Sequence, residues 1–293
     1  LFPYTTLFRS IIDDAEMGIT HVIRGLEYIS SIPRYLSLYE ALGLPAPVLA
    51  CMPHIMAPDG KKKLGKRDGA KSVTDYRTDG ILPEAMLNFL ASMGWNDGTE
   101  QEIFSKDELI EKFSLERVQK SGARFDEQRL LWMNGQWIRR LNLDDLYARV
   151  TPYWPASAAS ASEQHKKQVL GLVQDRLKTL AELAVMTKYF FEEPVPNKEL
   201  ITGNKQLAKL SDNDITQLLT AAKTALTATE WNPAAIQNTL NTLLEQTGQK
   251  PGTLFSLIRI TTTWAPFSPQ LNDTLALLGR DRTFQRLEQA INL

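Results

Sequence analysis

The sequence contains a single cysteine, Cys51, in 293 residues. One thiol can form neither a disulfide framework nor a cysteine-based zinc site, and this usage fits a reducing cytoplasm. No stretch approaches the roughly 18 apolar residues that a membrane span requires. The Gly-x-x-x-x-Gly-Lys-Ser/Thr motif is also missing, which argues against a generic P-loop nucleotide binder. Because Cys51 lies in an apolar run, we expect a buried and unreactive thiol.

A strong overall charge is missing as well. The formal net charge is −1, so any contact with nucleic acid must come from local basic patches. Hydrophobic residues make up 43% and charged residues 23%, which is typical of folded domains, and the length allows two of them. The three histidines, His21, His54 and His165, are isolated from other ligand residues, so we predict no metal site in the protein.

The most unusual segment is Asp59–Lys71, which holds six cationic and two acidic side chains in thirteen residues. Glycines at 60, 65 and 69 allow tight turns and a close approach of the backbone to a ligand. Clustered lysines attract polyanions, so the segment predicts a surface loop that binds phosphate. Taken alone, a solvated charge run remains the simpler alternative.

The residues before the loop favour the phosphate-binding interpretation. Leu44–Pro53 reads as a turn that leads into a short apolar strand, and Ile55 and Met56 extend the apolar run to the loop. Open α/β sheets bind nucleotides where a strand passes into such a loop.

Lys63-Leu64-Gly65-Lys66-Arg67 resembles the second signature of class I aminoacyl-tRNA synthetases, in the form typical of glutamyl-tRNA synthetases. Further segments are similar to the same family: Ile12–Gly25, Glu27–Pro33, Ser72–Arg77, Leu82–Leu90, Gly94-Trp95, Phe113–Val118 and Trp132–Gly135. The resemblance covers residues 11–190 strongly and the remainder weakly. The chain is identified as a member of the bacterial glutamyl-tRNA synthetases, because the related glutaminyl enzymes carry β-barrels where this sequence predicts helices.

The resemblance implies a set of site residues and ligands. Family members attach glutamate to the 3′ end of its tRNA through glutamyl-adenylate, using ATP with Mg²⁺. Lys63 and Lys66 would act as catalytic lysines that hold the β- and γ-phosphates. Arg24 would bind glutamate, because its planar guanidinium can pair with a carboxylate through two hydrogen bonds. The implied ATP-binding residues are Glu27, Ile55, Met56, Lys63, Leu64, Lys66 and Arg67. The implied partners are glutamate tRNA, glutamate and ATP, and we expect a monomer in the cytoplasm.

The sequence departs from the family in several places. Gly65 stands where serine is usual, and the lysine run Lys61–Lys63 is one residue longer. The first signature, His-x-Gly-His, is absent, and residues 1–10 do not fit the family pattern, so we interpret them as extraneous sequence joined to a truncated catalytic domain. We therefore expect the chain alone to be inactive. A non-catalytic tRNA-binding module remains the alternative.

Between the two strands the sequence predicts a helix that starts near Ser31-Ile32-Pro33 and stops at Gly43. Beyond the loop it predicts helices from about Pro83 to Met93, through Ile215–Leu226, from Asn232-Pro233 onward, and through Leu271–Leu278 with a stop at Gly279. The resemblance and the apolar spacing together predict a mostly α chain with a partial α/β part: residues 11–72 as the remnant of a Rossmann-like catalytic domain, 73–150 as a helical stem-contact subdomain, and 151–293 as an all-helical anticodon-binding domain. The boundary near 150 follows from the Pro-, Ser- and Ala-rich segment Thr151–Ser162.

Three local expectations concern this helical part. Apolar residues from Val169 to Ala184 predict one amphipathic helix. Trp132 and Trp137 are expected in the core. Arg259–Thr263 loosely resembles the family's Arg-x-x-x-Thr-Gly stretch, but Trp264 replaces the glycine, so anticodon specificity does not carry over. A short β pattern is also predicted at Ile11-Ile12, ahead of the strand at His21–Ile23.

Overall fold

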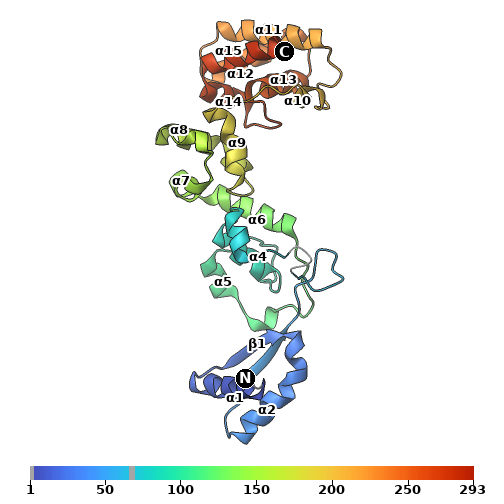
Figure 1. Cartoon of the computed structure of the whole chain (residues 1–293), viewed down its shortest axis with the longest axis vertical. Helices are drawn as coiled ribbons and strands as arrows, with labels where there is room; N and C mark the ends of the chain where they lie inside the picture. The colour runs from blue at the N-terminus through green and yellow to red at the C-terminus, as the bar shows by residue number, and fades with distance from the viewer. Residues whose placement is uncertain (1–2, 66–69) are drawn as a thin grey trace. The chain divides into compact units, whose positions relative to one another are not determined.

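A computed structural model describes residues 3–65 and 70–293, with side chains described from residue 7 onward (Figure 1). The chain separates into two compact units. Unit 1 contains the residues up to Asp75 and Pro83–Leu130, and unit 2 contains Tyr76–Leu82 and Leu131–Leu293. No helix in the described part of the chain is long and apolar enough to cross a membrane.

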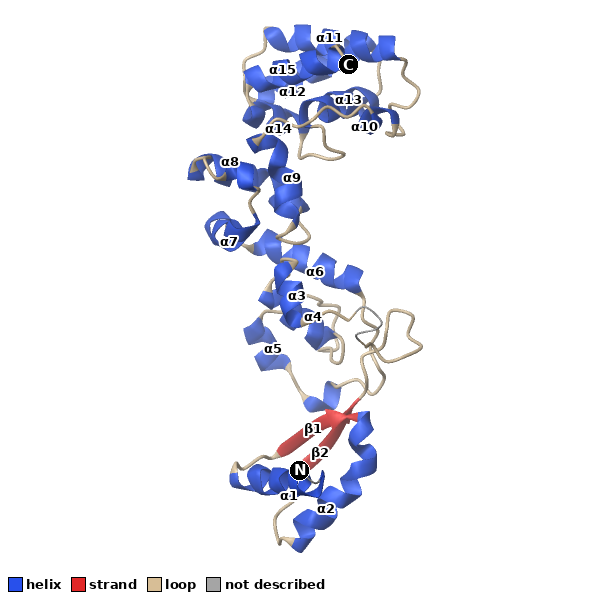
Figure 2. Cartoon of the chain, in the orientation of Figure 1, coloured by secondary structure: helices blue, strands red, loops and turns tan. Residues whose placement is uncertain are grey.

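The secondary structure is mostly helical, with two strands in the described residues (Figure 2). In unit 1 and at its borders the elements are α1 (Pro3–Glu16), β1 (His21–Gly25), α2 (Ile32–Ala41), β2 (Val48–Met52), α3 (Val73–Thr78), α4 (Pro83–Ser92), α5 (Lys106–Lys112) and α6 (Glu127–Arg140). In unit 2 follow α7 (Leu143–Val150), α8 (Glu163–Val173), α9 (Glu182–Phe191), α10 (Glu199–Thr202), α11 (Asp212–Thr227), α12 (Pro233–Thr247), α13 (Pro251–Thr263), α14 (Leu271–Leu278) and α15 (Arg280–Ile291). The prediction of a mostly α chain with a partial α/β part is confirmed.

The sheet consists of β1 and β2, which pair in parallel with Arg24 opposite Cys51. Helix α2 connects them after a 3-10 turn at Leu26–Ser31, and Gly43 follows in a left-handed conformation with φ of +67°. A parallel pair needs such a crossover, because its strands run in the same direction. The strand at His21–Ile23, the strand within Leu44–Pro53 and the helix between them are thus confirmed.

The predicted β pattern at Ile11-Ile12 is wrong, because both residues lie inside α1. Two adjacent apolar residues do not distinguish a strand from a helix. In the helix, Ile11 is fully buried and Leu7, one turn earlier, is half-buried. Tyr39 of α2 is also buried, and its hydroxyl donates to the Asp14 carboxylate of α1 at 3.4 Å.

The helical part of unit 1 packs around Trp95, Phe104 and Leu109. Helix α5 begins with a capping box, in which the Ser105 side chain accepts from the Glu108 backbone and the Glu108 carboxylate accepts from the Ser105 backbone. These two bonds satisfy donors that a helix start leaves open. The helix predicted at 83–93 is confirmed as α4.

Helices α10–α15 enclose the main core of unit 2. Their starts follow the sequence signals, since Asn232 precedes Pro233 at the start of α12 and accepts from the Ala235 backbone at 2.9 Å. The predicted helices through Ile215–Leu226 and Leu271–Leu278 are confirmed as α11 and α14, and Gly279 separates α14 from α15.

The predicted single helix from Val169 to Ala184 is wrong. Helix α8 ends at Val173, a 3-10 turn covers Gln174–Arg176, and α9 begins only at Glu182. The Glu182 carboxylate accepts the backbone N–H groups of Lys178 and Thr179 at 2.7 and 3.2 Å, and so competes with helix continuation. The Gln174 amide also donates to Ile138 and Leu141 carbonyls at the end of α6.

Trp132 is not a core residue, since 42% of it is exposed on α6, while Trp137 is half-buried. Their neighbours Met133 and Asn134 take the buried face of the helix instead. The Thr151–Ser162 segment forms two 3-10 turns, Thr151–Tyr153 and Ala156–Ala158, with Ala158 fully buried. The domain boundaries expected near residues 10, 72 and 150 stay predictions.

Candidate functional site

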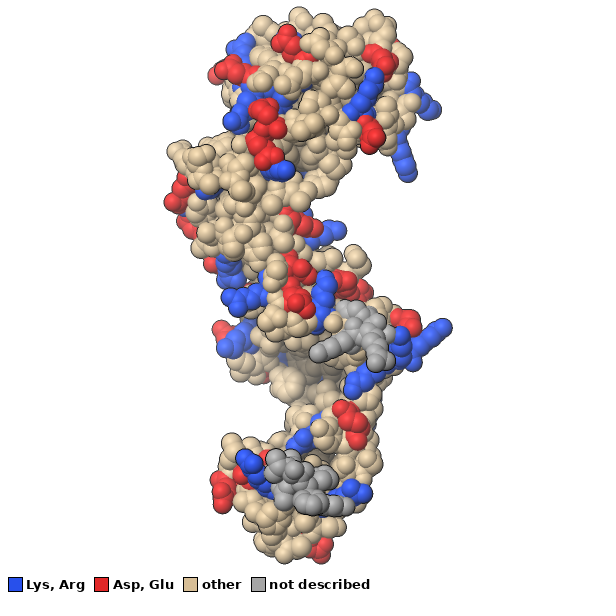
Figure 3. Space-filling model, viewed as in Figure 1, with Lys and Arg blue, Asp and Glu red and all other residues tan. Residues whose placement is uncertain are grey.

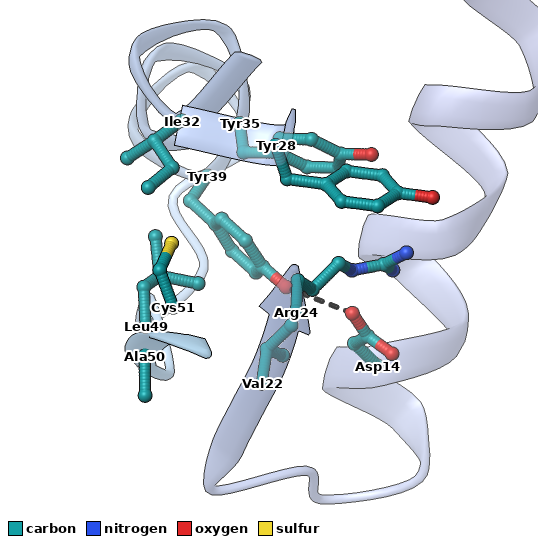
Figure 4. Close-up of a pocket in the computed structure, with 10 residues that line it drawn as sticks. All are labelled: Asp14, Val22, Arg24, Tyr28, Ile32, Tyr35, Tyr39, Leu49, Ala50 and Cys51. Atoms are coloured by element: carbon teal, nitrogen blue, oxygen red, sulfur yellow. Dashed lines mark hydrogen bonds between the residues drawn. The ribbon is translucent and has the colours of Figure 1, made fainter. Parts of the chain in front are cut away.

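Arg24, the predicted glutamate-binding residue, lines a pocket between the sheet and helices α1 and α2 (Figure 4). Its guanidinium carbon lies 4.8 Å from the centre of the Tyr28 ring, a cation–π distance. Asp14, Tyr35, Tyr39 and Cys51 line the same pocket. Burial and the nearby Asp14 carboxylate raise the pKa of Tyr39, which keeps this phenol neutral. The pocket therefore presents one cation and one carboxylate among phenol rings.

The half-buried thiol of Cys51 differs from the buried one that the sequence predicts. Cys51 is the partner of Arg24 in the register of the two parallel strands. Both residues line the pocket.

Glu27, a predicted ATP-binding residue, lies between the Lys63 ammonium and the His54 imidazole. Its Oε1 is 3.9 Å from the Lys63 Nζ, and its Oε2 is 3.5 Å from the His54 Nδ1. A hydrogen bond from its own backbone N–H lowers the pKa of Glu27, and the charges of Lys63 and His54 lower it further. The sequence singled out Glu27 and Lys63 but not His54, whose proximity to Glu27 only the fold reveals.

The predicted phosphate loop is a short hairpin in its described part. Met56 pairs with Lys63 in antiparallel fashion, Leu64 N–H donates to the Ile55 carbonyl at 2.8 Å, and Ala57 N–H donates to the Lys62 carbonyl at 2.8 Å. Lys and Arg side chains gather beside this hairpin in the space-filling view (Figure 3). Lys66 and Arg67 lie outside the described residues. Lys62 and Lys63 are thus held on the returning leg of a hairpin rather than on a free chain.

The first leg of this hairpin is fastened on its other side as well. Met56 N–H donates to the Ala123 carbonyl at 2.9 Å, and the Met56 carbonyl accepts from Phe125 N–H at 3.0 Å. Gly60 has φ of +70°, and a Cβ there would lie 2.5 Å from Arg124 Nε. The left-handed conformation favours glycine at this position, and a Cβ would also displace the Arg124 side chain. The backbone N–H and carbonyl of Met56, an implied ATP-binding residue, thus already have partners within the chain.

A second group of cations lies in unit 2, on residues for which the sequence proposed no role. Arg259 of α13 is half-buried and donates through Nε to the Ser268 hydroxyl at 3.0 Å. Burial and the positive charge of the nearby Arg176 lower the pKa of Arg259. No described carboxylate forms an ion pair with Arg176 or Arg259, and the Tyr189 hydroxyl, in the field of both arginines, is buried without a hydrogen-bond partner.

Arg176 is near enough for its charge to lower the pKa of Arg259, and two like charges without a described carboxylate partner favour an anion. We call Arg176, Arg259 and Tyr189 the arginine cluster. The segment Arg259–Thr263 loosely resembles a family stretch, whereas nothing in the sequence distinguishes Arg176, because exposed arginines are common.

Among the described residues no group of three or more His, Cys, Asp or Glu side chains could hold a metal ion. The acidic and imidazole groups at the hairpin, Glu27 and His54, are engaged with each other and with Lys63.

Two family models match the chain in succession. The model described as "tRNA synthetases class I (E and Q), catalytic domain" matches residues 5–132, and the one described as "Anticodon binding domain" matches residues 145–291. The first includes the Arg24 pocket and the hairpin, and the second includes the arginine cluster.

Three similar proteins are glutamate–tRNA ligases. The chain is 38% identical to a glutamate–tRNA ligase of Chloroflexus aurantiacus over 97% of this chain and 58% of that protein. It is 36% identical to one of Dehalococcoides mccartyi, over 99% of this chain and 60% of that protein. A crystal structure of a glutamate tRNA ligase from Elizabethkingia meningosepticum matches with a TM-score of 0.82 and 29% identity, covering 98% of this chain and 59% of that one.

The chain thus spans less than two thirds of the length of these relatives. Within that span the match is nearly continuous, and both family models fall on the parts of the fold described above. The chain belongs to the class I tRNA synthetases of the glutamate and glutamine group, with a catalytic-domain segment followed by an anticodon binding domain.

Proposed function

We propose that this chain is part of a glutamate–tRNA ligase, which joins glutamate to the 3′ end of its tRNA at the expense of ATP. The observation that carries the proposal is the arrangement at the hairpin, where Lys63 lies 3.9 Å from Glu27. This hairpin comes after β2, the strand that pairs with the strand of Arg24. Arg24, suited to a carboxylate, and the hairpin lysines, suited to phosphates, thus lie toward the same end of the sheet.

In this proposal Arg24 binds the glutamate carboxylate in the pocket of Figure 4. Glu27, Ile55, Met56 and Leu64 hold the ATP base and ribose, through side chains or through backbone groups that the hairpin frees as it moves. Lys63, Lys66 and Arg67 stabilise the phosphates, and Mg²⁺ enters as the ion bound to ATP. The protein contributes positioning and charge stabilisation, which are its main means of catalysing phosphoryl chemistry.

Two reactions follow in order. A carboxylate oxygen of glutamate attacks the α-phosphorus of ATP, and pyrophosphate leaves as glutamyl-adenylate forms. A terminal ribose hydroxyl of tRNA then attacks the acyl carbon, and AMP leaves. The lysines of the hairpin must meet ATP and then release pyrophosphate, which a hairpin can do by moving as a lid.

The tRNA is the expected partner of both units. We propose that the arginine cluster contacts tRNA, because two guanidiniums without a described carboxylate partner in the anticodon binding domain match the anionic backbone and the acceptor edges of bases. We further propose a monomer that acts in the cytoplasm, as a ligase that serves translation would.

The first experiment is tRNA-dependent ATP–pyrophosphate exchange with glutamate. It compares this chain with a version extended at its N-terminus by the residues that the longer relatives possess. Exchange only in the extended version supports a ligase whose site is completed by those residues. Exchange in neither version, with tRNA binding retained in both, would replace the proposal by the alternative of a non-catalytic tRNA-binding module.

A substitution tests the role of the hairpin lysines. In the extended version, Lys66→Ala should slow adenylate formation by about 100-fold or more and leave tRNA affinity nearly unchanged, because a phosphate contact is strengthened in the transition state. Single-turnover adenylate formation and filter binding of tRNA measure the two effects. Lys120→Ala, outside the hairpin, is the control. Equal losses in adenylate formation and tRNA binding would count against a phosphate role for Lys66.

A further inference from the structure

Arg286 of α15 is a fully buried cation in unit 2. Burial of an arginine is costly unless its donors are paired, and here every guanidinium nitrogen has a partner. Nε donates to the Glu193 Oε2 at 3.0 Å, Nη1 to the Thr262 carbonyl at 2.7 Å, and Nη2 to the Tyr189 carbonyl at 2.9 Å and the Glu192 carbonyl at 3.2 Å. One side chain on α15 therefore binds two other segments of the backbone.

The carbonyls that Arg286 binds belong to two helix ends. Tyr189 lies in the last turn of α9, Glu192 directly follows that helix, and Thr262 lies in the last turn of α13. Carbonyls at helix C-termini have no partner within the helix and carry partial negative charge, which favours a cation there. The guanidinium thus caps α9 and α13 simultaneously and fixes their ends relative to each other.

The two capped helices also carry members of the arginine cluster. Arg259 precedes Thr262 by three residues on α13. Tyr189 belongs to α9, where its carbonyl accepts from Arg286 while its buried hydroxyl has no hydrogen-bond partner. A shift of α9 against α13 would alter the distance between the Arg259 guanidinium and the cations and hydroxyl around it. A planar fork with five donors can hold three carbonyls and a carboxylate in one geometry, which an ammonium group cannot.

We propose that Arg286 is a positioning residue for tRNA recognition, which holds α9 and α13 in the register at which the arginine cluster meets an anionic or acceptor group of tRNA. The inference rests on the proposed tRNA contact of the cluster and adds a residue that touches no ligand. Glu193 supports it, because its carboxylate accepts from Arg286 at 3.0 Å and lies 3.8 Å from the Arg282 Nε. Arg282 in turn donates to the Phe190 carbonyl at 2.8 Å, so α9 is held at its end by two arginines one turn apart.

A double-mutant cycle on the full 293-residue chain tests the proposal. Equilibrium binding of transcribed glutamate tRNA is measured at fixed salt for wild type, Arg259→Ala, Arg286→Lys and the double variant. Arg259→Ala should weaken binding about tenfold, the loss expected for one charged hydrogen bond. Arg286→Lys should weaken it by a similar factor, and Arg259→Ala should then cost about twofold or less in the Arg286→Lys background, because the two substitutions disable the same contact.

The control is Ile236→Ala, a buried position of α12 outside the α9–α13 contact. Ile236→Ala should lower the melting temperature, as Arg286→Lys does, but leave tRNA affinity within about twofold at a temperature where both chains are folded. Glu193→Gln provides a second route if Arg286→Lys does not fold, since the substituted amide keeps a side-chain acceptor but loses the charge that orients the guanidinium. It should weaken tRNA binding about threefold with a smaller change in melting temperature, because a charge-assisted hydrogen bond becomes a neutral one.

The outcomes separate the two levels of the proposal. If Arg259→Ala and Arg176→Ala leave tRNA affinity unchanged in the wild-type background, the proposed tRNA contact of the cluster fails. If they weaken binding, but Arg259→Ala costs the same tenfold in the Arg286→Lys and Glu193→Gln backgrounds, the contact stands and the positioning role of Arg286 is overturned.

Discussion

Trp264 occupies a backbone conformation that residues with a Cβ rarely adopt. It has φ of 46° and ψ of 39° at the end of α13, and it is the one residue other than glycine with positive φ among those the structure describes. The related family pattern has glycine here. The residue is 8% exposed, and its indole N–H is buried without a partner. Burial of the ring thus offsets a strained backbone.

Replacement of Trp264 gives an unusual order of stabilities. Trp264→Ala and Trp264→Gly both lose the buried ring, at a cost of about 3–5 kcal/mol. Only glycine relieves the left-handed conformation, so Trp264→Gly should be more stable than Trp264→Ala by about 1–2 kcal/mol. Urea unfolding measures the difference, with Ala265→Gly as a control that should gain nothing. An alanine variant as stable as the glycine variant would mean that the backbone relaxes.

Asp97 makes the stability of unit 1 sensitive to acid. The Thr99 hydroxyl and backbone N–H donate to Asp97 Oδ1 at 2.7 and 3.0 Å, and Lys112 Nζ lies 3.1 Å from Oδ2. Hydrogen bonds from Thr99, and then the interaction with Lys112, lower the pKa of Asp97 to about 2. A depressed pKa in the folded state stabilises the fold above the ordinary carboxyl pKa, and this contribution is lost as the pH falls toward 2.

Asp97→Asn should therefore flatten the pH profile. Between about pH 4 and pH 2 the wild type should lose more stability than the variant, because only the wild type has this carboxylate to protonate. Thermal unfolding followed by circular dichroism across this range measures the difference. Parallel profiles for the two proteins would contradict the assignment of the low pKa to Asp97.

At the scale of elements, Asn134 of α6 joins three segments of unit 2. Its Oδ1 accepts from Leu82 N–H at 2.8 Å, and its Nδ2 donates to the carbonyls of Lys178 and Gly80 at 2.6 and 3.2 Å. The side chain is fully buried. The Lys178 carbonyl belongs to the turn between α8 and α9, so the amide also fixes the break that separates these helices.

Asn134→Leu should destabilise unit 2 by about 3 kcal/mol or more, because three buried backbone groups lose their partners. Asn238→Leu, at an exposed position of α12, should change stability by less than about 0.5 kcal/mol. Denaturant unfolding of both variants makes the comparison. A loss at Asn134 no larger than that at Asn238 would show that water replaces the amide.

The elements that the sequence predicts correctly are those with local signals. Gly43 after α2, the Asn232-Pro233 start of α12 and Gly279 after α14 each act on their own backbone, so one sequence reveals them. The break between α8 and α9 has no glycine or proline and depends on Glu182 and on Gln174 reaching α6. Such contacts between distant residues leave no pattern along the chain.

The residues of the candidate site also fall into those with a local sequence signal and those without one. Arg24, Glu27 and Lys63 could be singled out because they belong to recognisable motifs, and the fold brings Glu27 and Lys63 to one another. His54 beside Glu27, and Arg286 between two helix ends, depend on tertiary neighbours. The exposure of Trp132 could not be predicted either, because the residues next to it in the sequence are apolar and indicate a buried position.

At the scale of the whole chain, the strands and the helical core of unit 2 differ in how much they bury. Isolated two-stranded sheets are marginal in water, and Ile23 of β1 and Val48 of β2 are 50% and 59% exposed. Helices α11, α12, α13 and α15 instead share a continuous buried core.

Amide hydrogen exchange should therefore protect the chain unevenly. Residues 21–52 should exchange orders of magnitude faster than α11–α15, because local opening requires the exposure of little apolar surface there. Mass spectrometry of peptic fragments measures both regions in one sample. Equal protection of the two regions would show that the sheet gains its stability from contacts beyond its own strands.

The exposed Trp132 also gives the protein an optical property. The other tryptophans are buried or half-buried, whereas the Trp132 indole meets solvent on α6, within the segment matched by the catalytic-domain family. A dissolved quencher such as iodide reaches an exposed indole first, so the quenchable part of the intrinsic fluorescence reports mainly on this one ring. The chain thus carries its own spectroscopic reporter, and shielding of that signal would reveal a nucleic acid lying over α6 without any attached dye.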